Sequence, residues 1–413
     1  MRFLVLVLCC LSILTLNAQR NVLERIIKDQ GDTFGAWVDN PEQYEIQVLY
    51  TQIDRDAQGR PQFTSHRYGI DPNQYFYPAS TVKMPAAFMA LEKINELGIE
   101  GLDKHTAIQH FAGREPQTAA LADATTSSGL PSVENYLRKI FLVSGNDAFN
   151  RLYEFLGQAY FNERLRAKGF TDTRIIHRLS VSGYDTLGNR YTNPLQFVNE
   201  HGVLYQQGEA YSRFYDDFGL SKQVRGVAYM NNEGEIINEP FDFRYKNYVS
   251  IQDLHDMLKA VIFPESVSER ERFNLTSDDY ESLYRAMAQF PQESKSPKYD
   301  EPDNYVKFWM YGDRDSTFQI PKNIRILNKV GWAYGYLTDV AYIADTENDI
   351  EFFLVGTIHV NKNQTYNDGV YEYESEGLPF FAELGQAVYE YERERKRKYP
   401  ADLSWIEELL NDE

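Results

Sequence analysis

Two residues near the start of a long apolar segment could supply a nucleophile and its base. Ser80 and Lys83 stand three positions apart in YPASTVKMPAAFMALEKI, so a helix that begins there would place both side chains on one face. The N–H groups at the start of a helix stabilise negative charge near such a serine. A partly buried lysine beside other cations can lose its proton and act as the base. This is the single Ser-x-x-Lys pair in the chain, where about one is expected by chance.

Two further motifs add polar groups that could complete an active site. Ser144-Gly145-Asn146 lies in a tight turn between two predicted helices, and Lys329-Val330-Gly331 lies on a predicted strand. Taken singly, Asn146 fits a cap for the helix that follows it, and Lys329 fits a strand lysine whose ammonium group reaches solvent. The order of the three motifs along the chain favours a shared active site instead.

The elements that must position these motifs differ between the ends and the middle of the chain. Strands are predicted over residues 34–51, 62–70, 324–331, 335–344 and 350–360. Helices are predicted over residues 81–97, 132–142, 147–156, 251–263, 279–290 and 378–392. The last three strands have short connections, as in an antiparallel meander. Strands at both termini around a helical middle indicate a mixed α/β fold, built from both ends of the chain, with a helical domain inserted.

This pattern also predicts how the chain divides into domains. We expect a discontinuous α/β sandwich domain from residues 20–80 and 321–395. An α-helical domain over 81–320 would carry a long, loop-rich insertion near 205–320. Residues 396–413 form a tail dense in charges of both signs.

The first eighteen residues are typical of a secretory signal peptide. An arginine precedes an apolar run that ends near Ala18, and both cysteines, Cys9 and Cys10, lie inside that run. An uncleaved N-terminal anchor is the alternative. With cleavage, we expect a secreted or periplasmic protein that has no stable membrane insertion. Its mature form would have no cysteine nucleophile and no thiolate metal site.

The composition excludes several classes of protein. Lys+Arg 42 against Asp+Glu 61 gives a formal charge of -19, which argues against nucleic acid as a partner. A hydrophobic content of 43% argues against disorder. The chain has no His-Glu-x-x-His motif and no glycine-rich phosphate loop, so we expect neither a metal nor a cofactor. The oligomeric state stays open.

The three motifs, in this order, resemble those of the penicillin-recognising serine hydrolases, most closely the class A β-lactamases. Those enzymes carry Ser-x-x-Lys, Ser-x-Asn and Lys-Thr/Ser-Gly. The likeness covers about residues 34–200 and 324–390, and FLVSGNDAFNRLYEFLG is similar to the family's helix–turn–helix. Thr192-Asn193-Pro194 resembles the Thr-x-Pro that begins a helix after the family's Ω loop. The likeness implies an antiparallel sheet flanked by helices, with an inserted all-α domain.

The resemblance implies catalytic roles for three residues. Ser80 would attack a carbonyl carbon, and Lys83 would take the serine proton during acylation. Ser144 would relay a proton toward the leaving nitrogen.

It also implies a set of groups that bind the substrate. Asn146 would hydrogen-bond the substrate amide, and Lys329 would give positive charge to Ser144 and to a substrate carboxylate. Gly331 would permit a close backbone approach. The N–H groups of Ser80 and Trp332 would form the oxyanion hole.

The chain departs from the family pattern near the third motif and in the Ω loop. Val330 replaces a Thr or Ser whose hydroxyl helps to hold a carboxylate, and Trp332 is bulkier than the usual residue. HRLSVSGYDTLGNRYTNP stands where class A enzymes carry Glu-x-x-Leu-Asn. Aligning Arg178-Leu179 with the family's Arg-Leu puts Gly183 at the position of the deacylating Glu, with Asp185 as a nearby substitute.

These observations predict an exported serine hydrolase of the β-lactamase or penicillin-binding type. It would be acylated at Ser80 by a β-lactam or a related amide and would deacylate slowly. One alternative is a D-Ala-D-Ala-type peptidase or esterase that acts on a peptidoglycan-type substrate. The other is a non-catalytic binding protein on the β-lactamase fold.

Overall fold

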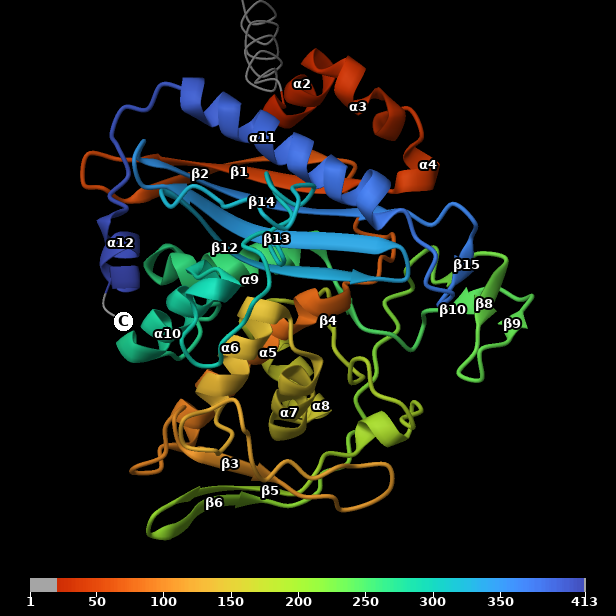
Figure 1. The fold of residues 1–413 in the computed structure, drawn as a ribbon, viewed down its shortest axis with the longest axis vertical. Helices are drawn as coiled ribbons and strands as arrows, with labels where there is room; N and C mark the ends of the chain where they lie inside the picture. The colour runs from red at the N-terminus through yellow and green to blue at the C-terminus, as the bar shows by residue number, and fades with distance from the viewer. Residues whose placement is uncertain (1–20, 412–413) are drawn as a thin grey trace, which may run out of the picture.

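A computed structural model describes residues 21–411, and a five-stranded antiparallel sheet lies at its centre (Figure 1). The strand order is β12-β13-β14-β1-β2. The strands are β1 Gln47–Arg55, β2 Pro61–Tyr68, β12 Ile324–Ala333, β13 Tyr336–Asp345 and β14 Ile350–His359. Gln47 of β1 pairs with Thr357 of β14, so the two ends of the chain share one sheet. The predicted signal peptide and both cysteines lie outside the described residues.

Helices cover both faces of this sheet. On one face lie α2 Val22–Asp29, α3 Gly31–Val38 and α11 Leu378–Glu394, as Figure 1 shows above the strands. The helical part of the molecule lies against the other face. Every residue of β13 and β14 is buried, because both faces are covered. A strand buried on both faces is apolar almost throughout, which explains runs such as IEFFLV.

The helical part is built around a buried central helix, α5 Lys83–Leu97, which Gly98 ends in a left-handed conformation with φ 59°. Around it lie α6 Val133–Val143, α7 Asn146–Leu156, α8 Gln158–Lys168, α9 Ile251–Ile262 and α10 Ser277–Ala288. Ser132, Ser250 and Thr276 cap the N-termini of α6, α9 and α10, because their side chains accept backbone N–H groups of the first turn.

The strand predicted over 34–51 is wrong in its first half. Residues 31–38 form α3, a short helix α4 follows at Pro41–Tyr44, and the strand begins only at Gln47. The apolar residues Phe34 and Trp37 stand three apart, which matches a helical face better than a strand. Trp37 packs its ring against Phe380 of α11, with ring centroids 5.6 Å apart. The tertiary contact with α11 therefore decides the local structure.

The inserted part is not all-helical, and the helix expected after Thr192-Asn193-Pro194 is a strand. A three-stranded sheet is formed by β3 Ala107–His110, β5 Leu195–Asn199 and β6 Gly202–Gln207. Leu195 and Phe197 of β5 are buried at alternate positions, which is the period of a strand. Phe197 packs against Phe155 of α7 at 5.2 Å, and this contact fixes the face that the strand turns inward.

The segment predicted as an insertion contains short strands joined by loops. They are β7 Val224–Arg225, β8 Ala228–Met230, β9 Ile236–Ile237, β10 Phe241–Asp242 and β11 Tyr248–Val249. From outside this segment, β4 Thr173–Arg174 pairs with β11, and β15 Thr365–Tyr366 pairs with β8. Within residues 21–411, no helix combines the length and apolarity needed to cross a bilayer.

The charged C-terminal segment carries a helix that docks on the molecule. In α12 Ser404–Asn411, Ile406 is fully buried, and Trp405 lies 5.1 Å from the ring of Tyr284 on α10 (Figure 1). The segment is therefore packed against the helical part.

Candidate active site

Ser80 lies in a tight turn at the wall of a cavity. A 3₁₀ turn over Ala79–Val82 runs directly into α5, and Ala79 adopts a left-handed backbone with φ 47°. The Thr81 hydroxyl donates to the Pro78 carbonyl at 2.7 Å and closes this turn. The cavity has a volume of about 980 Å³, and Ser80, Ser144 and Asn146 are among the residues that line it. The turn thus presents a serine hydroxyl to a space large enough for an organic substrate.

Lys83 is fully buried behind this turn and is held by three oxygen atoms. Its Nζ donates to the Ser144 carbonyl at 2.5 Å and to Asn146 Oδ1 at 2.6 Å, and lies 3.3 Å from Ser144 Oγ. Burial, together with the charge of Lys329, holds the pKa of Lys83 well below its ordinary value of 10.5. Among residues 21–411, no hydrogen bond joins Lys83 to the Ser80 hydroxyl. Such contacts are often loose before a substrate binds.

Ser144 is presented by the turn between α6 and α7, as the sequence predicts. It ends α6 in a left-handed conformation with φ 55°, and its backbone N–H donates to Lys139. Lys329 of β12 donates to Ser144 Oγ at 2.8 Å and to the Val330 carbonyl at 2.7 Å. The structure therefore brings residues from three distant motifs, Ser80-x-x-Lys83, Ser144 to Asn146 and Lys329, into one cluster.

Lys329 belongs to a buried polar network that extends away from the cavity. Burial lowers its pKa to about 7; the charge of Asp339 opposes this shift, and that of Lys307 adds to it. Asn328 donates to Asp339 at 2.8 Å and accepts from Lys307 at 2.8 Å. Burial raises the pKa of Asp339 to about 6. The charge on Lys329 is thus set by groups shielded from solvent.

Gly331 lies against the turn that holds Ser80. A Cβ atom at this position would lie 2.6 Å from the Pro78 carbonyl oxygen and 2.7 Å from the Ser80 nitrogen. Only glycine permits this approach. The strand edge that carries the Trp332 N–H group therefore runs directly beside the Ser80 N–H group.

The two departures on this strand have different consequences. Val330 is fully buried in the sheet core and is not among the residues that line the cavity. Trp332 is 36% exposed and lines the cavity, with Phe308 at 5.6 Å and Tyr305 at 6.3 Å. Trp332 and Tyr305 therefore form part of the cavity wall, with Phe308 buried beneath Trp332.

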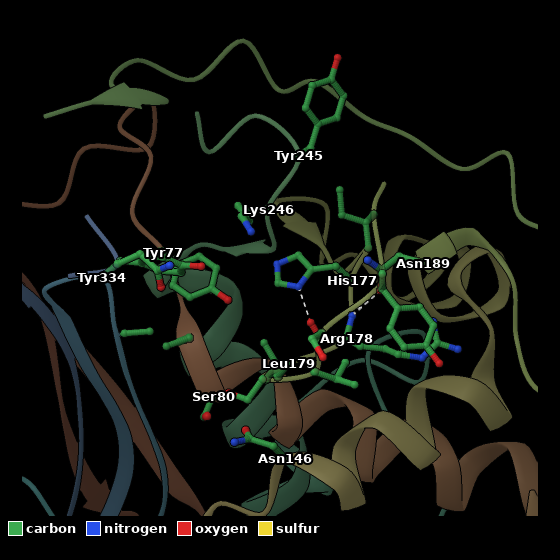
Figure 2. Close-up of a pocket in the computed structure, with 18 of the residues that line it drawn as sticks. Tyr77, Ser80, Asn146, His177, Arg178, Leu179, Asn189, Tyr245, Lys246 and Tyr334 are labelled. Carbon is green, nitrogen blue, oxygen red and sulfur yellow. Dashed lines mark hydrogen bonds between the residues drawn. The ribbon is translucent and has the colours of Figure 1, made fainter. Parts of the chain in front are cut away.

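Leu179 stands in the loop where the sequence lacks the family's Glu. Asn150 of α7 binds Leu179 by both backbone groups, accepting from its N–H at 2.8 Å and donating to its carbonyl at 3.0 Å. Asn150 follows Asn146 by one helical turn, so it holds Leu179 close to the cluster of Lys83 and Asn146. Leu179 lines the cavity and appears beside Ser80 and Asn146 in Figure 2. An apolar side chain occupies this part of the wall.

The residues that the sequence suggested for the missing Glu lie further along the same loop. Gly183 has φ +85° and packs against Pro116. A Cβ atom added at Gly183 would lie 3.0 Å from the Pro116 ring. Asp185 is exposed at the cavity wall and accepts the Gly188 N–H at 2.6 Å. Among the described lining residues, the other carboxylate is Asp242, which binds Arg244.

The sequence assigned no role to three residues of the cavity wall: Leu179, His177 and Lys246. Asn247 holds the last two side by side, because its side chain binds both backbone groups of His177. No spacing in the sequence indicates this contact between residues some seventy positions apart. The only local feature of the sequence that relates to this contact is that Asn247 directly follows Lys246.

A family model matches most of the chain. Residues 20–391 match the model of the "Beta-lactamase enzyme family". The chain belongs to the β-lactamase enzyme family. As a member, it is a serine hydrolase of the β-lactamase type.

This β-lactamase family member is similar to solved structures of other β-lactamases. A β-lactamase from Xanthomonas campestris pv. campestris superposes with a TM-score of 0.50 and 12% identity, covering 90% of this chain and 98% of its own. A β-lactamase from Burkholderia ambifaria gives a TM-score of 0.47 and 10% identity, covering 86% of this chain and 97% of its own. The first of these likenesses supports the mixed α/β architecture. The search of curated proteins found no match.

Proposed function

We propose that this β-lactamase family member acylates Ser80 with a β-lactam or a peptidoglycan-type amide and releases the acyl group slowly. One observation carries the proposal: Lys83 is buried among the oxygens of Ser144 and Asn146, while Leu179 occupies the adjoining wall. The first feature equips the site for attack on a carbonyl. The second leaves the acyl-enzyme without a neighbouring carboxylate to activate water.

The acylation step follows from the two short hydrogen bonds of Lys83. A neutral amine has two N–H groups, which the Ser144 carbonyl and Asn146 Oδ1 accept at 2.5 and 2.6 Å. The remaining lone pair can then take the proton of Ser80. Because its pKa is lowered, Lys83 loses its proton more readily than an exposed lysine does.

Bond formation and cleavage then involve the other residues of the cluster. Ser80 Oγ bonds to the carbonyl carbon, and the N–H groups of Ser80 and Trp332 stabilise the oxyanion. As the tetrahedral intermediate collapses, the C–N bond breaks. The proton held by Lys83 then reaches the leaving nitrogen through the Ser144 hydroxyl, which Lys329 orients from 2.8 Å.

In deacylation, water attacks the carbonyl carbon of the acyl-enzyme and the bond to Ser80 breaks. A base must take a proton from this water. The described carboxylates of the cavity are engaged elsewhere: Asp185 accepts from the Gly188 N–H, and Asp242 binds Arg244. General-base catalysis contributes about 10²–10⁴-fold to such steps. We therefore expect this acyl-enzyme to be hydrolysed more slowly, by a comparable factor, than the acyl-enzyme of a protein that has such a base.

Intact-mass measurement after treatment with benzylpenicillin tests the proposal. The wild-type protein gains one penicilloyl adduct, and Ser80→Ala gains none. Absence of an adduct on the wild type contradicts the proposal and favours a non-catalytic binding protein. Rapid hydrolysis of a chromogenic cephalosporin contradicts slow deacylation. Turnover of an acyl-D-Ala-D-Ala peptide or an ester, without accumulation of a penicilloyl adduct, favours a peptidase or esterase.

Export is the second part of the proposal. It is supported by the arginine, the apolar run and the small-residue exit of residues 1–18. The mass of the protein recovered from a bacterial periplasm tests it, because cleavage after Ala18 removes both cysteines. Recovery of the full-length chain from the membrane fraction contradicts cleavage.

A further inference from the structure

Lys329, which is expected to bind a substrate carboxylate, is not exposed in the cavity. Lys329 is 1% exposed and is not among the lining residues, and its ammonium group is committed to Ser144 Oγ and the Val330 carbonyl. Val330 contributes no hydroxyl. A substrate that carries a carboxylate therefore needs another cation in this cavity.

Lys246 is a cation of the cavity wall that has no acidic partner. Among residues 21–411, no carboxylate lies within ion-pair distance of its ammonium group, which faces the rings of Phe241 at 5.5 Å and Tyr334 at 5.8 Å. The buried lining residue Arg178, in contrast, pairs with Glu154 at 3.1 Å. The chain as a whole carries a charge of -19, so an uncompensated lysine in the cavity is a local exception.

The backbone around Lys246 is held rigidly against the segment that carries His177. Fully buried Asn247 accepts from the N–H groups of Ile176 at 2.8 Å and His177 at 3.1 Å, and donates to the His177 carbonyl at 3.2 Å. Arg174 donates to the Lys246 carbonyl at 3.2 Å. A preorganised wall of this kind is what a binding subsite requires.

His177 contributes an acceptor that has no partner. Its Nδ1–H donates to the Arg178 carbonyl at 2.5 Å, which leaves Nε2 as an acceptor. Nε2 is buried and has no hydrogen bond within residues 21–411. Burial, together with the charge of Lys246, lowers the pKa of His177 to about 3, so the ring stays neutral. Buried polar atoms in native proteins are nearly always hydrogen-bonded, and this exception points to a missing partner.

This wall adjoins the nucleophile. The ring of Tyr77, three residues before Ser80, lies parallel to His177 with centroids 6.2 Å apart, and it contacts Tyr334 at 5.1 Å. Figure 2 shows His177 and Lys246 on the wall across the cavity from Ser80, with Tyr77 and Tyr334 beside them. A ligand group bound to Lys246 would thus belong to the same molecule that Ser80 attacks.

Building on the function proposed above, we propose that Lys246 and His177 form a subsite for an acidic arm of the substrate. The Lys246 ammonium pairs with a carboxylate, and His177 Nε2 accepts the N–H of a neighbouring amide. The rings of Tyr77 and Tyr334 cover the connecting atoms. The substrate class is therefore a peptide or acylamino compound that carries a free carboxylate on the part distant from the bond that Ser80 attacks.

Two penicillins that differ only in such a carboxylate test the subsite. Carbenicillin is benzylpenicillin with a carboxylate added to the side chain, next to the amide. We expect the wild type to be acylated about tenfold faster by carbenicillin, the size of effect that a hydrogen-bonded charge pair produces. In Lys246→Met, the ratio of the two rates falls to near one, and Lys246→Arg retains a ratio above one. Equal rates in the wild type, or a preference that persists in Lys246→Met, overturn the proposal.

A binding measurement separates the subsite from the chemistry. Calorimetric titration of Ser80→Ala with each penicillin reports binding alone. There we expect tighter binding of carbenicillin, a preference lost in Ser80→Ala/Lys246→Met. If Ser80 is never acylated but this preference is present, the proposed function fails and the subsite stands. Equal affinities overturn the subsite, whatever happens at Ser80. Melting curves of each variant verify that the fold is retained.

Discussion

Lys329 donates a hydrogen bond to the hydroxyl of Ser144 at 2.8 Å. Lys83 lies 3.3 Å from the same oxygen, so two buried ammonium groups converge on one hydroxyl. Burial and the charge of Lys329 lower the pKa of Lys83, whereas burial and the charge of Lys307 lower the pKa of Lys329. The pair can therefore divide two tasks, with one lysine neutral as the base and the other charged beside the proton relay.

The pH dependence of acylation is expected to be bell-shaped. The rate rises with pH as Lys83 loses its proton and becomes a base. It falls through pH about 7, where Lys329 loses the charge that orients Ser144. In Lys329→Arg the guanidinium stays protonated, so the alkaline fall moves to higher pH. Second-order acylation rates with benzylpenicillin from the acidic to the alkaline range measure both limbs. An alkaline limb unchanged by this substitution would refute the assignment.

Replacement of Lys83 separates the base from a purely structural lysine. We expect Lys83→Met to slow acylation by about 10²–10⁴-fold, the contribution of a positioned base. Lys83→Arg is expected to be equally slow, because a guanidinium does not release its proton. Rates from time-resolved labelling with a fluorescent penicillin provide the comparison, with circular dichroism as the control for folding. Near-normal labelling of the arginine variant would show that only positive charge is needed.

Leu179→Glu is expected to restore deacylation. Asn150 holds the backbone of this residue, so the substitution places a carboxylate on the wall near Lys83 without moving the loop. We expect loss of the acyl adduct to accelerate by about 10²-fold or more. Leu179→Gln is the matched control, since it has the same shape and no basic oxygen. Intact mass followed over time after removal of free penicillin measures the rate, and equal persistence in both variants contradicts the model.

Gly331→Ala is expected to disable the oxyanion hole. The added methyl group would lie 2.7 Å from the Ser80 nitrogen, so the turn and its N–H group must shift. Loss of one such donor costs about 10²–10³-fold in rate. Gly35→Ala in α3 is the control, because its nearest neighbour would lie at 3.7 Å. Acylation rates of the two variants should differ by this factor, and equal rates would argue against a close fit at Gly331.

Asp253 makes stability depend on pH. Burial raises its pKa from 3.8 to about 7, although Asp253 accepts hydrogen bonds from Thr173 and the Asp172 N–H at 2.8 Å. A carboxyl whose folded pKa is raised stabilises the fold at low pH and loses that contribution as pH rises through 7. The shift corresponds to about 4 kcal/mol. Asp253→Asn should remove this dependence. The free energies of unfolding in urea of the wild type and of this variant should therefore diverge between pH about 4 and 8. If the unfolding free energies of the two proteins change with pH in parallel, this assignment of Asp253 is wrong.

The cluster of Ser80, Lys83, Ser144, Asn146 and Lys329 could be predicted because each member stands in a short motif on a strongly patterned element. What the sequence could not predict depends on contacts between distant segments. Residues 31–38 form a helix whose Trp37 packs against Phe380 of α11, and β5 is a strand whose Phe197 packs against Phe155 of α7.

The residues of the cavity wall show the same limit. Leu179 takes its place from Asn150, and His177 and Lys246 meet through the side chain of Asn247. Neither contact has a spacing that recurs in sequence. A hydrogen bond from one asparagine side chain to a distant backbone is invisible until the fold is known.

The pairing of Gln47 with Thr357 has a consequence for how the protein is made. The central strand β14 is synthesised long after its neighbour β1, and contacts between residues so distant in the chain form slowly. While the helical middle emerges, β1 and β2 can form only a hairpin that lacks its neighbours. A chain truncated before β14 would therefore remain sensitive to proteases in β1 and β2. The complete chain would become resistant in a single late step, when its last third arrives.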